Sequence, residues 1–131
     1  MFIKTDYYSK CQNEQQFKMS WLKKNSGQNG YTRFPIETEE TVKGFPDVLT
    51  INNYDSSCYF TEFKFTKTGK IKFQPTQPAF YKAHPELRIQ VVAYNAKTGT
   101  VHEFGVGCLF NKTCEYALND KAEVDLNKAE V

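Results

Sequence analysis

The sequence contains few of the features that place a chain in a specialised class. No apolar run approaches the roughly 20 residues of a membrane-spanning helix, and no apolar segment follows the first lysine as it would in a secretory leader. We therefore expect no membrane association and a cytoplasmic location. The formal net charge of +2 argues against a uniformly basic nucleic-acid binder, and 131 residues predict one domain with a single core.

Cysteine pairs with the C-x-x-C spacing of a zinc site are also absent. The four cysteines are widely separated: Cys11, Cys58, Cys108 and Cys114. Because no secretory leader is visible, we predict free thiols in a reducing compartment. A zinc site that combines some of these thiols with His84 or His102 is the less favoured alternative.

The sequence is rich in aromatic residues, and its charges are unevenly distributed. Aromatics make up 15% of the chain, including 11 Phe and 8 Tyr. From Glu115 to the end, five acids stand against two lysines, so this segment carries −3 and the remainder +5 of the total of +2. Four lysines lie close together in the remainder: Lys64, Lys67, Lys70 and Lys72. Such a group suits either a surface that faces a polyanion or a solvated hairpin.

Hydrophobic periodicity predicts an α/β domain over residues 1–118. Its expected elements, in order, are a helix over 10–24 capped by Ser9, strands over 31–36, 48–51 and 58–66, a helix over 75–84, strands over 89–94 and 101–110, and a short helix that ends near Leu118. The strand over 58–66 is apolar on both faces apart from three positions, so we expect it to be central and largely buried. Residues 119–131 are predicted to form a flexible acidic tail.

Two acids and a lysine are the strongest candidates for a functional site. Asp47 ends the turn Gly44-Phe45-Pro46-Asp47, and Glu62 and Lys64 lie two residues apart on the strand over 58–66. Residues two apart on a strand point to the same face, and a hairpin with the preceding strand would bring Asp47 beside Glu62. Such a set can bind a divalent cation and activate water beside a phosphate. The structural alternative is an ion pair between Glu62 and Lys64 on a half-exposed strand.

Three further residues have both a functional and a structural interpretation. Glu14 lies in line with the apolar residues of the first helix, so its carboxylate either reaches water at the edge of that stripe or points inward to the metal site. Glu37 belongs to an acidic connection that is either solvated or reaches the metal. Gln77, at the start of the second helix, is either a capping or solvent-facing amide, or a residue that orients water or touches phosphate.

The order of these elements and motifs resembles the PD-(D/E)xK nuclease superfamily, most closely the small virus-type replication-repair nucleases and the Holliday-junction resolvases. The resemblance covers roughly residues 10–95 and rests on Gly44-Phe45-Pro46-Asp47, then Glu62-Phe63-Lys64, then Gln77 at the opening of a helix. It implies a restriction-endonuclease-like αβββαβ core, in which helices flank a mixed central sheet. The strands after Asn95 would then form an additional C-terminal hairpin.

The same resemblance implies a Mg²⁺-dependent DNA endonuclease, in which Mn²⁺ can substitute for Mg²⁺. It assigns the metal to four residues: Glu14, Asp47, Glu62 and, through its main-chain carbonyl, Phe63. It assigns catalysis to Asp47, Glu62, Lys64 and Gln77, with the lysine next to the attacking water. The expected reaction is hydrolysis of phosphodiester bonds, selective for DNA structure, in recombination or repair of phage or mobile-element DNA.

The expected partner is branched or duplex DNA, in the host cytoplasm if the source is viral. Lys67, Lys70 and Lys72 are expected to contact flanking phosphates without reading sequence. A junction resolvase makes two symmetric cuts, so we expect a homodimer. The alternative function is that of a non-catalytic protein on the same fold, which binds DNA or inhibits another nuclease in an anti-defence role.

Overall fold

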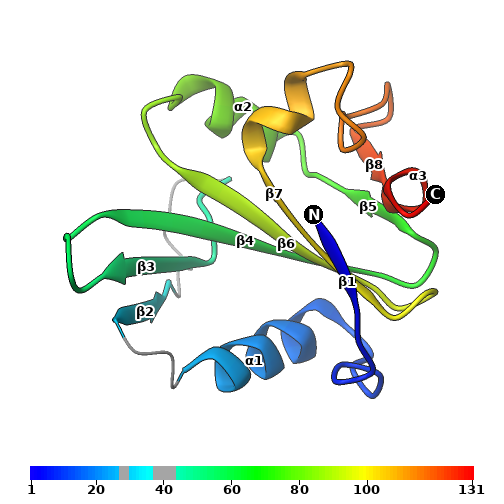
Figure 1. Ribbon diagram of the computed structural model, residues 1–131. Coiled ribbons are helices and arrows are strands. Elements are labelled where there is room, and N and C mark those ends of the chain that lie inside the picture. The colour runs from blue at the N-terminus through cyan, green and yellow to red at the C-terminus, as the bar shows by residue number, and fades with distance from the viewer. Residues whose placement is uncertain (27–29, 37–43) are drawn as a thin grey trace.

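Strand β4 (Cys58–Thr66) forms the centre of a six-stranded mixed sheet in the computed structural model (Figure 1). The structure describes residues 1–26, 30–36 and 44–131. The strand order is β1-β7-β6-β4-β3-β2, in which β4 runs parallel to β6 and the other neighbours are antiparallel. The flanking strands are β1 (Phe2–Lys4), β2 (Tyr31–Pro35), β3 (Val48–Asn52), β6 (Ile89–Asn95) and β7 (Thr100–Gly105).

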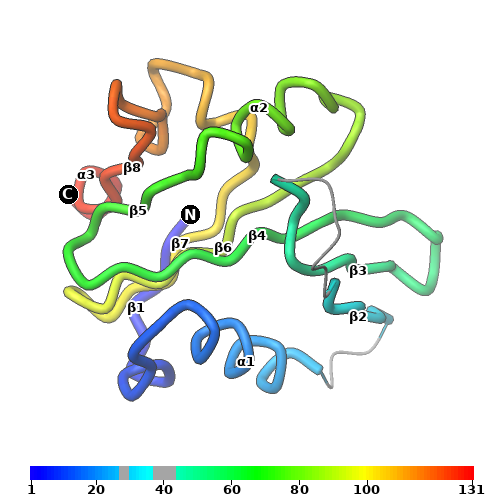
Figure 2. The backbone as a smooth tube through the Cα atoms, turned by 180° about the vertical axis from the view of Figure 1, so that it is seen from behind, coloured from blue at the N-terminus to red at the C-terminus, as the bar shows by residue number. Residues whose placement is uncertain are grey.

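A parallel pair of strands needs a connection that crosses one face of the sheet. Between β4 and β6 this connection contains β5 (Lys70–Lys72) and α2 (Thr76–Ala83). Helix α1 (Glu14–Asn25) lies on the opposite face, as the front view in Figure 1 and the back view in Figure 2 both show. The predicted α/β fold, with a mixed central sheet between helices, is therefore confirmed.

Each face of the sheet carries its own hydrophobic core, and both cores pack against β4. On the α1 side, Phe17 and Trp21 pack edge-on against Phe63, at ring-centroid distances of 6.0 and 5.2 Å. On the α2 side, Phe80 and Tyr81 pack with apolar residues of β5, β6 and the C-terminal segment. The middle of β4 is consequently buried, as predicted, so a charged side chain there needs a partner that the fold or a ligand supplies.

Helix α1 begins at Glu14, later than the predicted start at residue 10, and Ser9 does not cap it. Asn13 is the N-cap, because its side chain accepts a hydrogen bond of 2.9 Å from the backbone amide of Gln16. The Gln16 side chain in turn accepts from the backbone amide of Gln12 at 2.8 Å. These two hydrogen bonds stabilise a helix that begins after Asn13 and not after Ser9. Glu14 therefore lies in the first turn of the helix.

The C-terminal segment is folded, and the prediction of a flexible tail over 119–131 is wrong. Strand β8 (Glu123–Asp125) pairs antiparallel with β5 to form a second, two-stranded sheet, and α3 (Leu126–Ala129) follows directly. Val124 and Leu126 are fully buried. The acidic composition concealed this packing, because its apolar residues become buried only through pairing with a distant strand.

The region between β7 and β8 also differs from the prediction. The strand expected over 101–110 ends at Gly105 and continues as a short 3-10 helix, η1 (Val106–Phe110). Turns replace the short helix predicted up to Leu118. Among the described residues, no helix has both the length and the apolar character needed to cross a membrane.

A disulfide joins Cys108 and Cys114, which contradicts the prediction of four free thiols. The two residues are six apart in sequence, and the turn after η1 brings their Cα atoms to 5.7 Å, within the range that a disulfide requires. No spacing motif in the sequence predicts this disulfide. Cys11 and Cys58 are free, as expected.

Candidate metal centre

The turn before β3 places Asp47 beside β4. Gly44 has a φ of +91°, a left-handed conformation that favours glycine, and a Cβ atom there would overlap the main-chain carbonyl of Thr76 in α2. The turn therefore packs directly against α2. At the other end of the turn, the backbone amide of Asp47 donates to the carbonyl oxygen of Thr61 at 3.0 Å.

The Asp47 carboxylate lies beside β4, just beyond the last residue pair between β4 and β3. The last pair between the two strands is Val48 with Thr61. Beyond it, Oδ2 of Asp47 accepts a hydrogen bond of 3.0 Å from the backbone amide of Phe63. A side chain, in place of a further strand residue, thus satisfies this main-chain donor and fixes the carboxylate over the middle of β4.

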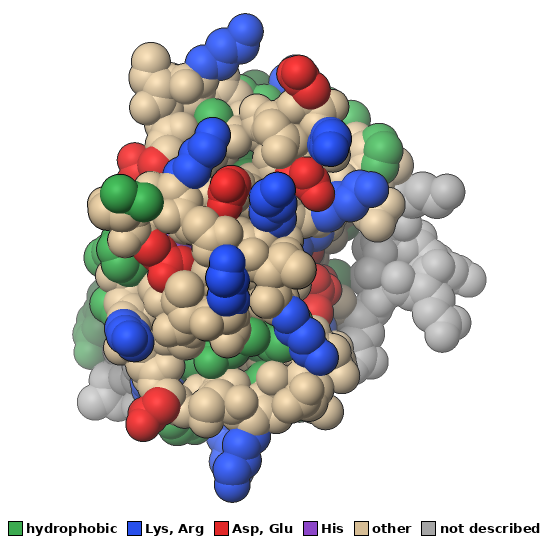
Figure 3. Space-filling view, turned by 90° about the vertical axis from the view of Figure 1, so that its right-hand side faces the viewer, with side chains coloured by type: hydrophobic (Ala, Val, Ile, Leu, Met, Phe, Trp, Pro, Cys, Tyr) green, Lys and Arg blue, Asp and Glu red, His purple; other side chains and the backbone are tan. Residues whose placement is uncertain are grey.

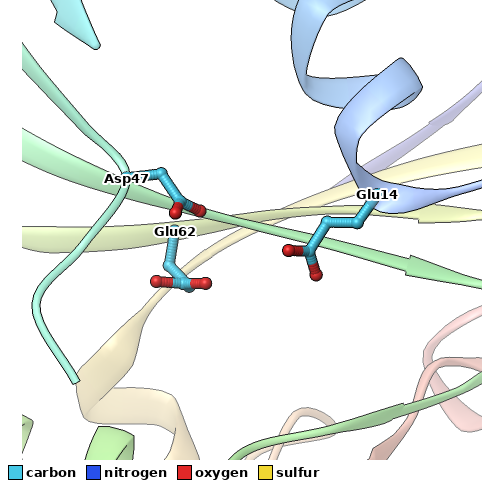
Figure 4. Close-up of side chains that lie close together, drawn as sticks. All are labelled: Glu14, Asp47 and Glu62. Carbon is cyan, nitrogen blue, oxygen red and sulfur yellow. The ribbon is translucent and has the colours of Figure 1, made fainter. Parts of the chain in front are cut away.

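Three carboxylates converge at this point (Figure 4). Glu14 comes from the first turn of α1, Asp47 from the turn before β3, and Glu62 from β4. One ligand oxygen of each lies within 4.8 Å of the other two. In the described part of the chain no comparable group contains cysteine or histidine, so the zinc alternative has no support there.

Glu62 is the most deeply buried of the three acids. Its side chain is 3% exposed, and its Oε1 has no hydrogen-bond partner within the described protein. Burial raises the pKa of Glu62 well above its usual value, the charge of Asp47 raises it further, and Lys64 lowers it. A partnerless carboxylate oxygen beside two further carboxylates is an environment that a hard divalent cation stabilises, so the residues present fit Mg²⁺ or Mn²⁺.

Glu14 completes the cluster from its rim. The residue as a whole is exposed, yet protein atoms crowd its carboxylate, and this desolvation raises the pKa of Glu14. The positive charge of Lys64 lowers that pKa, and the negative charge of Asp47 raises it again. Of the two interpretations of Glu14, the structure thus favours the inward one. Glu37, the other acid considered for the site, lies outside the described residues.

Lys64 lies next to the acids, on the same face of β4 as Glu62. Its Nζ donates to Oε1 of Gln77 at 2.9 Å and lies 4.7 Å from the centroid of the Phe73 ring. Oε1 of Gln77 also accepts from the backbone amide of Gln74 at 2.9 Å. Gln77 thus binds Lys64 and the backbone of Gln74, which precedes the helix, whereas no side chain caps α2 itself.

Tyr81 also lies near the acids, although the sequence alone did not identify it as a candidate site residue. Its hydroxyl is buried and has no hydrogen-bond partner in the described chain. Burial raises the pKa of Tyr81, and the negative charges of Glu62 and Asp47 raise it further, so the hydroxyl lies in the field of the acids. The sequence spacing could have indicated Tyr81 as a site residue, because it follows Gln77 by four residues and shares its face of α2.

The three lysines expected to contact DNA lie outside the carboxylate cluster. Nζ of Lys67 is 3.5 Å from Oε1 of Gln12, just before α1. Lys70 and Lys72 are exposed on β5, and each stands opposite an acid of β8. Figure 3 shows the molecule from the side of β5 and β8, where basic and acidic side chains are interspersed. Each of these two lysines therefore has an acid as its cross-strand neighbour.

The chain was compared with known proteins at the levels of sequence and structure. No family model matches it, and no curated protein matches it by sequence. Among solved structures it is similar to Hjc of Archaeoglobus fulgidus, described as a Holliday junction resolvase from an archaeal hyperthermophile. The TM-score is 0.60 at 13% sequence identity, over 87% of this chain and 89% of that chain. At this identity the likeness establishes the fold, and it confirms the resemblance to the resolvase type of nuclease fold at that level.

Proposed function

We propose that the protein is a divalent-metal-dependent endonuclease that hydrolyses phosphodiester bonds in DNA. The observation that carries the proposal is the convergence of three carboxylates from three separate elements, within 4.8 Å of one another. A buried lysine stands beside them, and the fold is shared with a Holliday junction resolvase. Mg²⁺ is the proposed metal and Mn²⁺ its substitute, because both prefer oxygen ligands.

The metal would be held by the side chains of Glu14, Asp47 and Glu62. The main-chain carbonyl of Phe63 is the proposed fourth protein ligand, since the amide of the same residue already points to Asp47, and the amide and carbonyl of one strand residue face the same neighbour. When bound, the metal neutralises charge on the phosphate and makes a water molecule more acidic.

Lys64 supplies the remaining positive charge. Its ammonium group would stabilise the negative charge that develops as water attacks the phosphorus atom. Gln77 is proposed as a positioning residue, because its side-chain oxygen already accepts hydrogen bonds from Lys64 and from the amide of Gln74. It aims the ammonium and does not need to touch the substrate.

The proposed substrate is branched DNA, on the basis of the resolvase fold. Lys67 is the best placed of the three candidate lysines, since it lies beside the residues that precede α1 and Glu14. Lys70 and Lys72 would contribute less, because β8 places an acid opposite each of them. A homodimer is part of this proposal, since two active sites related by a twofold axis make two symmetric cuts.

Cleavage of a defined DNA panel tests the proposal. Labelled four-way, flapped, nicked and linear DNAs are incubated with the protein, with Mg²⁺ or with EDTA. We expect cleavage only with metal, strongest on the four-way junction, and none by Asp47→Asn, which keeps the shape of the side chain. The exposed variant Glu86→Gln is the control and should cleave like the wild type.

Several outcomes would contradict the proposal or a part of it. Cleavage by Asp47→Asn, or cleavage in EDTA, would exclude a reaction that depends on this metal centre. Calorimetric binding of Mg²⁺ without cleavage of any DNA would instead favour the non-catalytic alternative. A monomeric mass in light scattering, with junction DNA present, would exclude the homodimer.

A further inference from the structure

The ammonium group of Lys64 is held apart from the acids that surround it. Among the described residues no carboxylate lies within 4.0 Å of its Nζ, since the only ion pairs at that distance are His84 with Glu86 and His102 with Glu130. Yet its charge acts on Glu62 and Glu14, so the acids are near. A flexible lysine in such a place would normally close onto a carboxylate, so something keeps it away.

Two contacts hold Lys64 in this position. One is the hydrogen bond to Gln77, and the other is the face of the Phe73 ring, whose centroid lies 4.7 Å from Nζ. Phe73 is fully buried and Lys64 is 8% exposed, so the contact is largely shielded from water. An ammonium group over an aromatic face is attracted more strongly when both are desolvated.

The position of Phe73 is itself fixed by the C-terminal segment. Its backbone amide donates to the carbonyl oxygen of Ala122 at 3.0 Å, and its ring packs edge-on against Tyr81 at 6.4 Å. Ala122 has a φ of +58°, a left-handed conformation that is uncommon for a residue other than glycine. The protein thus keeps a strained residue at the point where the segment meets Phe73.

We propose that Phe73 is a positioning residue that holds the Lys64 ammonium clear of the acidic cluster, so that the cation stays available to the reacting phosphate and the carboxylates stay available to the metal. The catalytic part of this inference rests on the proposed nuclease function. The placement of Lys64 by Phe73 stands on the geometry and can be tested without cleavage.

Nuclear magnetic resonance of lysines labelled with ¹³C at Cε tests the placement. The Lys64 signal, assigned by its loss in Lys64→Arg, should be shifted upfield by the ring current of Phe73. Phe73→Leu should return it to the range of the other lysines. Phe104→Leu, which shortens a buried aromatic in the same core without contact to Lys64, is the matched control and should leave it unchanged. An unshifted Lys64 signal in the wild type overturns the inference.

Kinetics on the four-way DNA test the consequence. At a temperature where all variants are folded, Phe73→Leu should lower the single-turnover rate about tenfold, whereas Phe104→Leu should stay within about twofold of the wild type. Trifluorophenylalanine at position 73 keeps the volume of the ring but weakens its negative face, so it should slow the reaction as well. Because the Lys64 ammonium would close onto the carboxylates in Phe73→Leu, the affinity for Mn²⁺ measured by calorimetry should fall in that variant and stay unchanged in Phe104→Leu.

The two experiments separate this inference from the proposed function. If the wild type cleaves and Phe73→Leu is no slower than Phe104→Leu, the positioning role fails and the nuclease stands. If the trifluoro variant cleaves at the wild-type rate, packing and not ring charge is responsible, and the inference again fails. If the wild type cleaves nothing, the nuclease proposal fails, and the Lys64 signal alone decides whether Phe73 holds the ammonium.

Discussion

Glu62 contributes to the pH dependence of the stability of the metal-free protein. Burial and Asp47 raise its pKa in the folded state above its value in the unfolded chain. Such a group costs no stability at low pH, where both states are protonated. The cost appears as pH rises above the unfolded pKa and is complete above the folded pKa. Removal of this charge should therefore stabilise the fold only at the higher pH.

The variant Glu62→Gln tests this residue with little change in shape. In EDTA, its melting temperature should exceed that of the wild type by several degrees at pH 8 and should nearly equal it at pH 4. Glu115→Gln, at an exposed position, is the control and should change little at either pH. A gain at pH 4 that equals the gain at pH 8 would contradict the electrostatic origin of the effect.

Tyr81 offers a second prediction at the residue scale, because its hydroxyl is buried without a partner. Tyr81→Phe removes an unsatisfied polar group, so the free energy of unfolding in EDTA should stay constant or rise by about 1 kcal/mol. Tyr116→Phe is the matched control, since its hydroxyl is hydrogen bonded to Nδ1 of His102 at 2.9 Å and its loss should cost about 1 kcal/mol. Urea denaturation measures both, and a clear loss in Tyr81→Phe would refute the prediction.

Among the elements, the turn before β3 depends on a single glycine. Gly44→Ala would force a side chain into a left-handed backbone position and against the carbonyl of Thr76, so we expect a loss of about 2 kcal/mol in urea denaturation. The affinity for Mn²⁺ should fall as well, because Asp47 ends this turn. Gly105→Ala is the control, since no atom lies near its added Cβ, and it should be nearly neutral.

The C-terminal segment gives the second prediction at the element scale. Leu126 is fully buried in the core beside α2. Leu126→Ala should therefore lower the free energy of unfolding by about 2 to 5 kcal/mol, whereas Val131→Ala, at the exposed last residue, should change it by less than about 0.5 kcal/mol. Equal stability of the two variants would show that the segment is not packed in solution.

The sequence predicted the long central elements and the acids that they carry. Alternation along β4 places Glu62 and Lys64 on one face, and the Gly-Phe-Pro-Asp turn places Asp47 next to them, because both depend on local geometry. The two-stranded sheet of β5 and β8 was missed, because its strands have three residues each and meet only in the folded chain. The disulfide and the contact of Phe73 with Lys64 were missed for the same reason, since neither leaves a local pattern.

For the whole molecule, the proposed metal binding would be linked to proton binding and to folding. Glu14 and Glu62 both have raised pKa values, so protons compete with a cation for them more strongly than for ordinary carboxylates. Because a cation that binds only the folded state stabilises it, Mg²⁺ should raise the melting temperature. This increase should be larger at pH 8 than at pH 5 and should be absent in Asp47→Asn. Scanning calorimetry with matched NaCl as the ionic-strength control measures it, and an equal increase at both pH values would contradict the linkage.

A segment far along the sequence from the three acids supports part of the candidate site, and this sets the order in which the site can assemble. The amide of Phe73 is bonded to Ala122, and β8 supports β5. During translation the three acids leave the ribosome well before these residues do. A nascent chain would therefore carry the three candidate metal ligands while Lys64 still lacks its support. Lys64 would gain this support only after the segment that contains Ala122 and β8 has been synthesised and has folded onto β5.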